Sequence, residues 1–234
     1  PITSINLNED YGERELQVDQ AIKFFQKAAY VARVGKSIEE VEKVKTVLLD
    51  WSKNNALKEG INASWGDKPV YWQIMVLINS ILTTTAVISE SFDSNERQIL
   101  GPWLNNLIKK VAKSNWKDRQ DNKAYQTSYM TLIWGLMVND LNAVQNSINV
   151  VKLAVHDMRP DGSFPIDTQR GGMGIDYNSK SYGYLLMMAS ILKGKTGEDL
   201  FSYTVDGRSL HTGADFVIRS IKEPSKMNSI YAIS

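Results

Sequence analysis

The chain has 234 residues, of which 43% are hydrophobic and 23% are charged, so it is long enough to bury a core as an ordinary globular protein. Its 27 basic and 26 acidic residues give a formal charge of +1, so no overall field attracts nucleic acid or any other polyanion. The chain has no cysteine and two histidines, which excludes disulfides and thiol catalysis. We therefore expect no metal centre, no cofactor and no nucleic-acid partner.

Apolar residues recur at helical spacing through almost the whole chain, and no strand pattern repeats. A capping box from Ser37 to Glu40 marks one helix start. The predicted helices span residues 13–33, 37–56, 69–90, 94–114, 122–138, 141–158, 177–193 and 208–222. Short polar connections join them, so we expect an all-α fold of antiparallel pairs. No linker divides the chain, which predicts a single domain over residues 1–234.

Two longer stretches, 115–121 and 159–176, have no helical pattern, and long loops in a compact domain are often functional. The second contains Gly171, Gly172 and Gly174, but these match no phosphate-binding pattern and no strand precedes them. We therefore interpret it as a loop between helices. The longest apolar runs, such as the one from Ile74 to Ile81, are too short to cross a bilayer, so we expect no membrane segment.

The second loop also carries a motif. Its residues 162–170 read GSFPIDTQR, and Tyr177 follows the arginine by seven positions. This resembles the segment G-x-[LF]-P-x-E-x-x-R of the alginate lyase family (poly(mannuronate) lyases, polysaccharide lyase family 5), in which a tyrosine stands at the same spacing. Residues 121–126, DNKAYQ, are similar to the family's N-N-H-x-Y-W, and residues 47–57 are similar to one of its helices.

The resemblance extends over roughly residues 18–220, and the chain departs from the family at four motif positions. Lys123 stands where the family has histidine, and Gln126 where it has tryptophan. Asp167 replaces a glutamate, and Asn178 replaces the histidine after the tyrosine. These differences bear on the substrate more than on the fold, which the resemblance implies to be an α/α toroid.

The resemblance also implies a reaction, the β-elimination of a 1,4-linked polyuronate. The proton on C5 is weakly acidic, so the adjacent carboxylate must be neutralised while a base removes that proton and an acid protonates the leaving oxygen. Asn122, Lys123 and Arg170 are expected to neutralise the carboxylate, and Tyr177 to act as base and acid. Taken singly, an asparagine such as Asn122 is more often a helix cap, and a lysine such as Lys123 is more often solvated. An arginine is more often a surface ion-pair partner, and a tyrosine at a helix start more often packs its ring.

Further candidates are aromatic or basic residues that can contact a sugar. The residues expected to bind substrate are Trp65, Trp72, Trp116, Tyr125 and His211. We expect Trp51, Trp103 and Trp134 to be core residues instead. A loose basic run with Trp116 over residues 113–123 can suit nucleic acid, but the balanced charge favours an anionic glycan.

The family's usual substrate is polymannuronate, and glucuronan or another acidic exopolysaccharide stays open. The resemblance implies a monomer in the periplasm or outside the cell. Two other classes remain as alternatives: a non-catalytic protein that binds acidic carbohydrate on the same fold, and a helical interaction domain that binds no sugar. Incubation with several polyuronates distinguishes all three, because only a lyase generates an unsaturated uronate.

Overall fold

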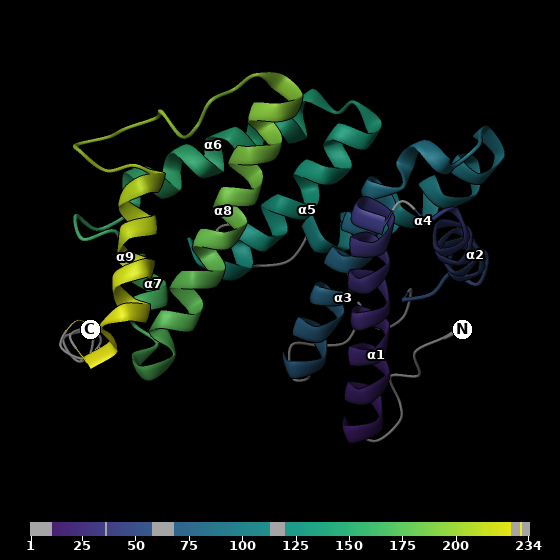
Figure 1. Ribbon diagram of the computed structural model, residues 1–234, viewed down its shortest axis with the longest axis horizontal. Helices are drawn as coiled ribbons and strands as arrows, with labels where there is room; N and C mark the ends of the chain where they lie inside the picture. Colours follow the sequence, from purple (N-terminus) through teal and green to yellow (C-terminus); the bar gives the residue numbers. More distant parts are fainter. Residues whose placement is uncertain (1–10, 36, 58–67, 113–119, 226–229, 231–234) are drawn as a thin grey trace. The chain divides into compact units, whose positions relative to one another are not determined.

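The computed structural model describes residues 11–35, 37–57, 68–112, 120–225 and 230 (Figure 1). In this part of the chain the regular elements are helices, and the only extended pairing is an isolated bridge between Val205 and Arg208. No helix among these residues is sufficiently long and apolar to span a bilayer. The backbone contacts divide the chain into two compact units, Pro1–Lys113 and Ser114–Ser234. A single domain over residues 1–234 stays a prediction.

The first unit pairs its long helices, α1 with α3 and α2 with α4. Its elements are α1 (Tyr11–Tyr30), a π-helical turn (Val31–Gly35), α2 (Ile38–Lys53), α3 (Lys68–Val87), a 3₁₀ turn (Ser89–Ser91) and α4 (Ser94–Ala112). The four helices expected in this part of the chain are confirmed. The helix expected to end at 56 stops at Lys53, because Asn55 and Leu57 take positive φ angles of 51° and 64°.

Large aromatic side chains fill the core of the first unit. The Trp51 ring meets the Phe25 ring edge-on with centroids 5.4 Å apart, which packs α2 against α1. The Trp103 indole donates to the Ala56 carbonyl at 2.8 Å, so its one polar atom is satisfied. The expected burial of Trp51 and Trp103 is confirmed. Trp134, in the second unit, is only partly buried.

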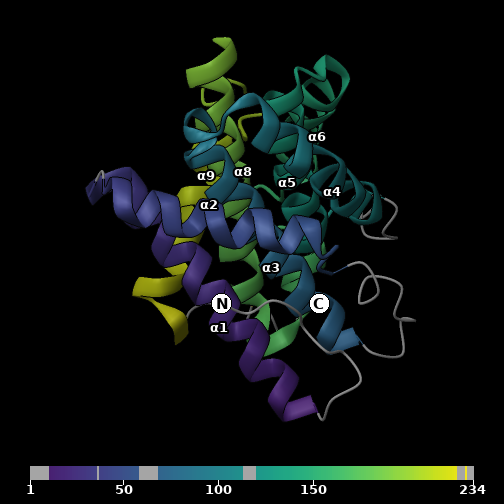
Figure 2. The same cartoon turned by 90° about the vertical axis from the view of Figure 1, so that its right-hand side faces the viewer.

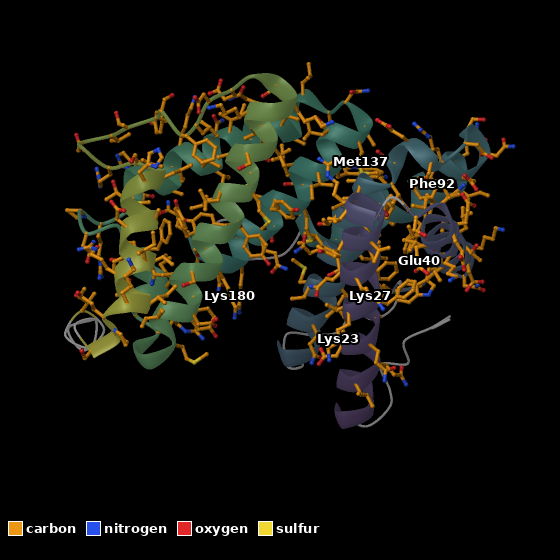
Figure 3. All side chains as sticks on the ribbon, viewed as in Figure 1. Lys23, Lys27, Glu40, Phe92, Met137 and Lys180 are labelled. Carbon is orange, nitrogen blue, oxygen red and sulfur yellow. The ribbon has the colours of Figure 1, made fainter. Side chains whose placement is uncertain are left out.

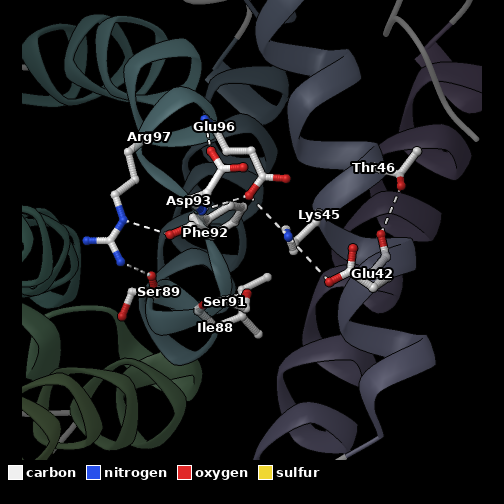
Figure 4. Close-up of polar contacts among 10 residues, drawn as sticks. All are labelled: Glu42, Lys45, Thr46, Ile88, Ser89, Ser91, Phe92, Asp93, Glu96 and Arg97. Atoms are coloured by element: carbon white, nitrogen blue, oxygen red, sulfur yellow. Dashed lines mark hydrogen bonds and ion pairs between the residues drawn. The ribbon is translucent and has the colours of Figure 1, made fainter.

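A group of polar contacts joins α2 to the start of α4 (Figure 4). The Lys45 ammonium lies 3.3 Å from a Glu42 oxygen and 3.1 Å from a Glu96 oxygen, although its side chain is almost buried. Glu96 also accepts the Asp93 backbone N–H at 2.9 Å, and Asp93 accepts the Glu96 N–H at 2.8 Å. This reciprocal cap fixes the first turn of α4.

The second unit is built around α8, which contacts α5, α6, α7 and α9 (Figures 1 and 2). Its elements are α5 (Asn122–Val138), α6 (Leu141–Asp157), α7 (Pro165–Thr168), a 3₁₀ turn (Gly171–Met173), α8 (Gly174–Thr196) and α9 (Leu210–Lys222). The stretch 159–176, expected to be a loop, contains α7, whose first residue is a proline suited to a helix start. The helix expected from 177 begins at Gly174 because the 3₁₀ turn leads directly into it.

The loop before α7 is fastened against α9. Gly162 has a φ of 94°, and a Cβ placed there would lie 2.2 Å from the Thr212 carbonyl oxygen of α9. The Arg219 guanidinium of α9 donates to the Asp161 carbonyl at 2.8 Å, and the Asp161 carboxylate accepts the Ser163 N–H at 2.9 Å. These contacts hold in place the segment that leads to the GSFPIDTQR motif.

Candidate active site

The first turn of α5 presents an amide without a protein partner. Asp121, rather than the expected Asn122, caps the helix, because its carboxylate accepts the Lys123 and Ala124 N–H groups at 3.1 and 3.2 Å. Asn122 is therefore the first helical residue. Its side chain is 2% exposed, and its Nδ2 has no hydrogen-bond partner. Leaving such a group unpaired costs about 1–3 kcal/mol, so it marks a donor held ready for a ligand or for water.

Arg170 and Tyr177 are in direct contact across the 3₁₀ turn. Arg170 Nη2 donates to the Tyr177 hydroxyl oxygen at 3.4 Å, and the guanidinium carbon lies 4.6 Å from the Tyr177 ring centroid. Arg170 is exposed and Tyr177 is partly buried, so a ligand in solution can reach the pair.

A second cation, which the sequence reasoning missed, lies over the same ring. Lys180, labelled on α8 in Figure 3, has its Nζ 5.5 Å from the Tyr177 ring centroid and 2.6 Å from an Asp176 oxygen. The signal was available, because residues three apart on a helix are neighbours and Lys180 follows Tyr177 by that spacing. The exposed ion pair with Asp176 partly offsets the lysine charge at the ring.

Asp167 connects the first turn of α5 to α8. One of its oxygens accepts the Asn122 backbone N–H at 3.4 Å, and the other accepts the Ser181 hydroxyl. Ser181 lies one helical turn after Tyr177, and Arg170 follows Asp167 by three residues. These contacts connect the first turn of α5 with the part of α8 that contains Tyr177, which Arg170 contacts.

The Asp167 carboxyl is 2% exposed, and its burial raises its pKa to about 6. The hydrogen bonds from Ser181 and from the Asn122 backbone oppose this shift because they favour the charged form. The negative charge of Asp121 raises the pKa further, and the positive charge of Arg170 lowers it. The site therefore contains a buried carboxylate whose charge changes close to neutral pH.

Asn178 occupies the position where the family motif has a histidine, and here it is a structural residue. Its Oδ1 accepts the Phe164 N–H at 2.7 Å, and its Nδ2 donates to the Gly174 carbonyl at 2.8 Å. The Phe164 N–H lies at the start of α7, where a helix leaves N–H groups unsatisfied, and the Gly174 carbonyl belongs to the preceding turn of α8. The buried amide thereby fastens α8 to the start of α7.

Two residues expected at the site have other surroundings. The Tyr125 side chain is 2% exposed and its ring centroid lies 5.6 Å from that of Phe164, so the ring packs against Phe164. His211 lies beside Phe201, with ring centroids 6.4 Å apart. A part for either residue in substrate binding stays a prediction.

The remaining candidates stay predictions. Lys123 lies in the first turn of α5 directly after Asn122, with a partly buried side chain. Trp72 belongs to α3 in the first unit. Trp65 and Trp116 lie outside the described residues, as does most of the expected 115–121 loop.

The described residues form a helical fold, whose second unit holds Arg170 in contact with Tyr177 and the buried amide of Asn122. A family model described as "Alginate lyase" matches residues 20–227. The chain therefore belongs to the alginate lyase family, and its expected fold class, an all-α α/α toroid, is confirmed.

Similar proteins span more sequence than this chain. A protein described as "Polysaccharide lyase" from Stenotrophomonas maltophilia is 23% identical over 184 residues, which are 76% of this chain and 53% of that protein. The chain thus spans about half the length of the curated relative it matches.

The solved structures of alginate lyase A1-III show the same fold. The structure of the Sphingomonas species A1 enzyme is 18% identical, with a TM-score of 0.81 over 98% of this chain and 67% of that one. A variant of alginate lyase A1-III complexed with a tetrasaccharide is 18% identical, with a TM-score of 0.82 over 97% of this chain and 67% of that one.

Proposed function

We propose that this chain is a polysaccharide lyase that cleaves a 1,4-linked polyuronate such as polymannuronate by β-elimination. The observation that carries the proposal is the contact of the Arg170 guanidinium with the Tyr177 hydroxyl, in a neighbourhood that also contains the unpartnered amide of Asn122. Membership of the alginate lyase family supports it, and the tetrasaccharide complex of alginate lyase A1-III supports an oligosaccharide ligand.

In this proposal the first task of the site is to neutralise the substrate carboxylate. Removing the C5 proton places negative charge on that carboxylate, so donors aimed at it stabilise the transition state. The Asn122 amide donates one hydrogen bond, and the exposed Arg170 guanidinium can grip both carboxylate oxygens. Lys123, beside Asn122, adds a point charge, because an ammonium can only donate.

The second task is proton transfer, which we assign to Tyr177. The phenolate takes the C5 proton, the C5 electron pair forms a double bond to C4, and the C4–O bond of the glycosidic linkage breaks. The phenol then returns its proton to the leaving oxygen, so tyrosine ends the cycle as it began. One residue acting at both atoms implies syn elimination on a mannuronate-like ring.

A substrate panel tests the proposal. The protein is incubated with polymannuronate, mixed alginate, glucuronan and a neutral glucan, and the ultraviolet band of the unsaturated uronate is followed. We expect that band with at least one polyuronate and none with the neutral glucan. Binding of a polyuronate without elimination would instead support a non-catalytic carbohydrate-binding protein, and no binding at all would support a helical interaction domain.

The same proposal places the protein in the periplasm or outside the cell, where a polymer too large for the cytoplasm is met, and has it act as a monomer. Cell fractionation with an antibody against the chain tests the first statement. Sedimentation velocity at increasing protein concentration tests the second.

A further inference from the structure

The buried carboxylate of Asp167 contacts Asn122 directly, and its partner Ser181 lies on α8 one helical turn after Tyr177. Asp167 accepts the backbone N–H of Asn122 and the hydroxyl of Ser181, which are 45 and 14 residues away in the chain. Arg170 Nη2 in turn reaches the Tyr177 oxygen at 3.4 Å, one helical turn before Ser181.

We propose that Asp167 is a positioning residue of the elimination site, which holds the first turn of α5 and the second turn of α8 in register so that Asn122, Arg170 and Tyr177 act together. The inference rests on the proposed function. It assigns Asp167 no contact with substrate, because its two oxygens already accept hydrogen bonds from Asn122 and Ser181.

The charge of Asp167 contributes to this role. An ionised carboxylate accepts hydrogen bonds more strongly than a protonated one, and charge-assisted bonds are about twice as strong as neutral ones. The ionised form also attracts the Arg170 guanidinium. Protonation of Asp167 therefore weakens its hold on Asn122, on Ser181 and on Arg170 at the same time.

The groups facing Asp167 come from each element around it. Asp121 and the buried Tyr125 phenol lie on the α5 side, Arg170 follows α7, and Ser181 is on α8. Burial, followed by the Asp167 charge, raises the pKa of Tyr125, so this phenol stays neutral through the neutral range. Asp167 is thus the group whose charge changes near pH 6 in this part of the site.

Such a carboxylate is unfavourable for folding, which is a reason to seek a function for it. The folded-state pKa of Asp167 is raised from 3.8 to about 6, so its contribution to stability is present below pH 4 and is lost as the pH rises to about 6. A neutral side chain of similar size avoids this loss. Retaining a buried acid at the cost of stability is typical of functional sites.

Three variants separate charge from position. Asp167→Asn keeps the shape and removes the charge, Asp167→Glu keeps the charge and moves the oxygens, and Ser181→Ala removes one hydrogen bond without touching substrate. The measurements are kcat and KM from pH 5 to 9, binding of an oligouronate by calorimetry at pH 7, and thermal unfolding over the same pH range.

For the unchanged protein, we expect log kcat/KM to fall more steeply below about pH 6, where Asp167 becomes protonated. Asp167→Asn should lose this break, with kcat reduced at least tenfold at pH 7. Asp167→Glu should keep the break with a lower kcat. Ser181→Ala should move the break to higher pH, because the lost hydrogen bond favoured the charged form.

The outcomes are separable from those of the proposed function. If the unchanged protein cleaves a polyuronate and a folded Asp167→Asn variant has the same kcat and pH profile, the inference is wrong while the function stands. If the protein binds oligouronates without cleaving them, the proposed function is wrong. In that case a tenfold loss of binding in Asp167→Asn would support the positioning role, and unchanged binding would contradict it. Absence of both activities overturns both.

Discussion

The guanidinium of Arg170 lies over the Tyr177 ring at 4.6 Å while one of its nitrogens reaches the phenol oxygen at 3.4 Å. One cation thus contacts both the π face and the reactive atom of the same tyrosine. Arg170 is exposed, so the pair can be reached from solution. In the proposed function this contact connects carboxylate binding by Arg170 with proton transfer by Tyr177.

Removing the guanidinium should abolish most turnover. Arg170→Ala is expected to lower kcat/KM by about 10²–10³, the usual effect of losing one donor to a developing negative charge. Arg170→Lys should recover only part of the activity, because an ammonium cannot grip a carboxylate bidentately. Initial rates of unsaturated-uronate formation measure both variants. Turnover of Arg170→Ala within a few-fold of the unchanged protein would contradict the assignment.

The Tyr177 hydroxyl can be removed without disturbing the ring. We expect Tyr177→Phe to lose elimination activity and to keep its fold, since Arg170 and Lys180 still lie over the ring. Oligouronate binding should persist, because carboxylate recognition is assigned to other residues. Circular dichroism and calorimetry serve as controls for fold and binding. A folded, binding-competent Phe variant with undiminished activity would remove Tyr177 from the mechanism.

Lys123 tests the main departure from the family. Lys123→Gln should lose most activity and move the rising limb of the pH–rate profile to higher pH, because an ammonium near the site favours the phenolate. Lys123→His should recover part of the activity at lower pH. Lys193→Gln is a matched control, as Lys193 is exposed and paired with Asp199 at the far end of α8. Profiles of Lys123→Gln and the unchanged protein that coincide would show a lysine without a catalytic part.

Gln126 offers a test of stability. Its side chain is fully buried, and neither its amide nitrogen nor its amide oxygen has a hydrogen-bond partner. Gln126→Met, of similar volume, should therefore raise the free energy of unfolding by about 1–3 kcal/mol. The exposed Gln145→Met on α6 is the control and should change stability by less than about 0.5 kcal/mol. Urea denaturation measures both. A loss of stability in Gln126→Met would mean that a bound water satisfies the amide.

The loop before α7 can be tested at its glycine. Gly162 and Gly207 both have positive φ, but only at Gly162 would a Cβ meet backbone atoms. Gly207→Ala should lower the free energy of unfolding by about 1–3 kcal/mol, because alanine is strained in the left-handed conformation. Gly162→Ala should lower the free energy of unfolding by more than this and should also lower kcat. The added methyl group must displace α9 from the segment that leads to Asp167. Equal melting temperatures for the two variants would show that the loop is not clamped against α9.

Local patterns in the sequence predict the helical fold class, which is confirmed. Amphipathic spacing is a local property, so it predicted the helices that became α2 and α6 within a few residues. The choice of Asn122, Arg170 and Tyr177 as site residues came from the family resemblance, and their roles stay predictions.

Other features were decided only by the tertiary structure. Burial of the Tyr125 ring against Phe164 depends on how separate helices pack. The contacts of Asp167 join residues 45 and 14 positions apart, and no local pattern encodes such a pairing. The charge state of Asp167 likewise depends on burial, because removal of water raises the pKa of a carboxyl, and burial exists only once α5, α7 and α8 have come together.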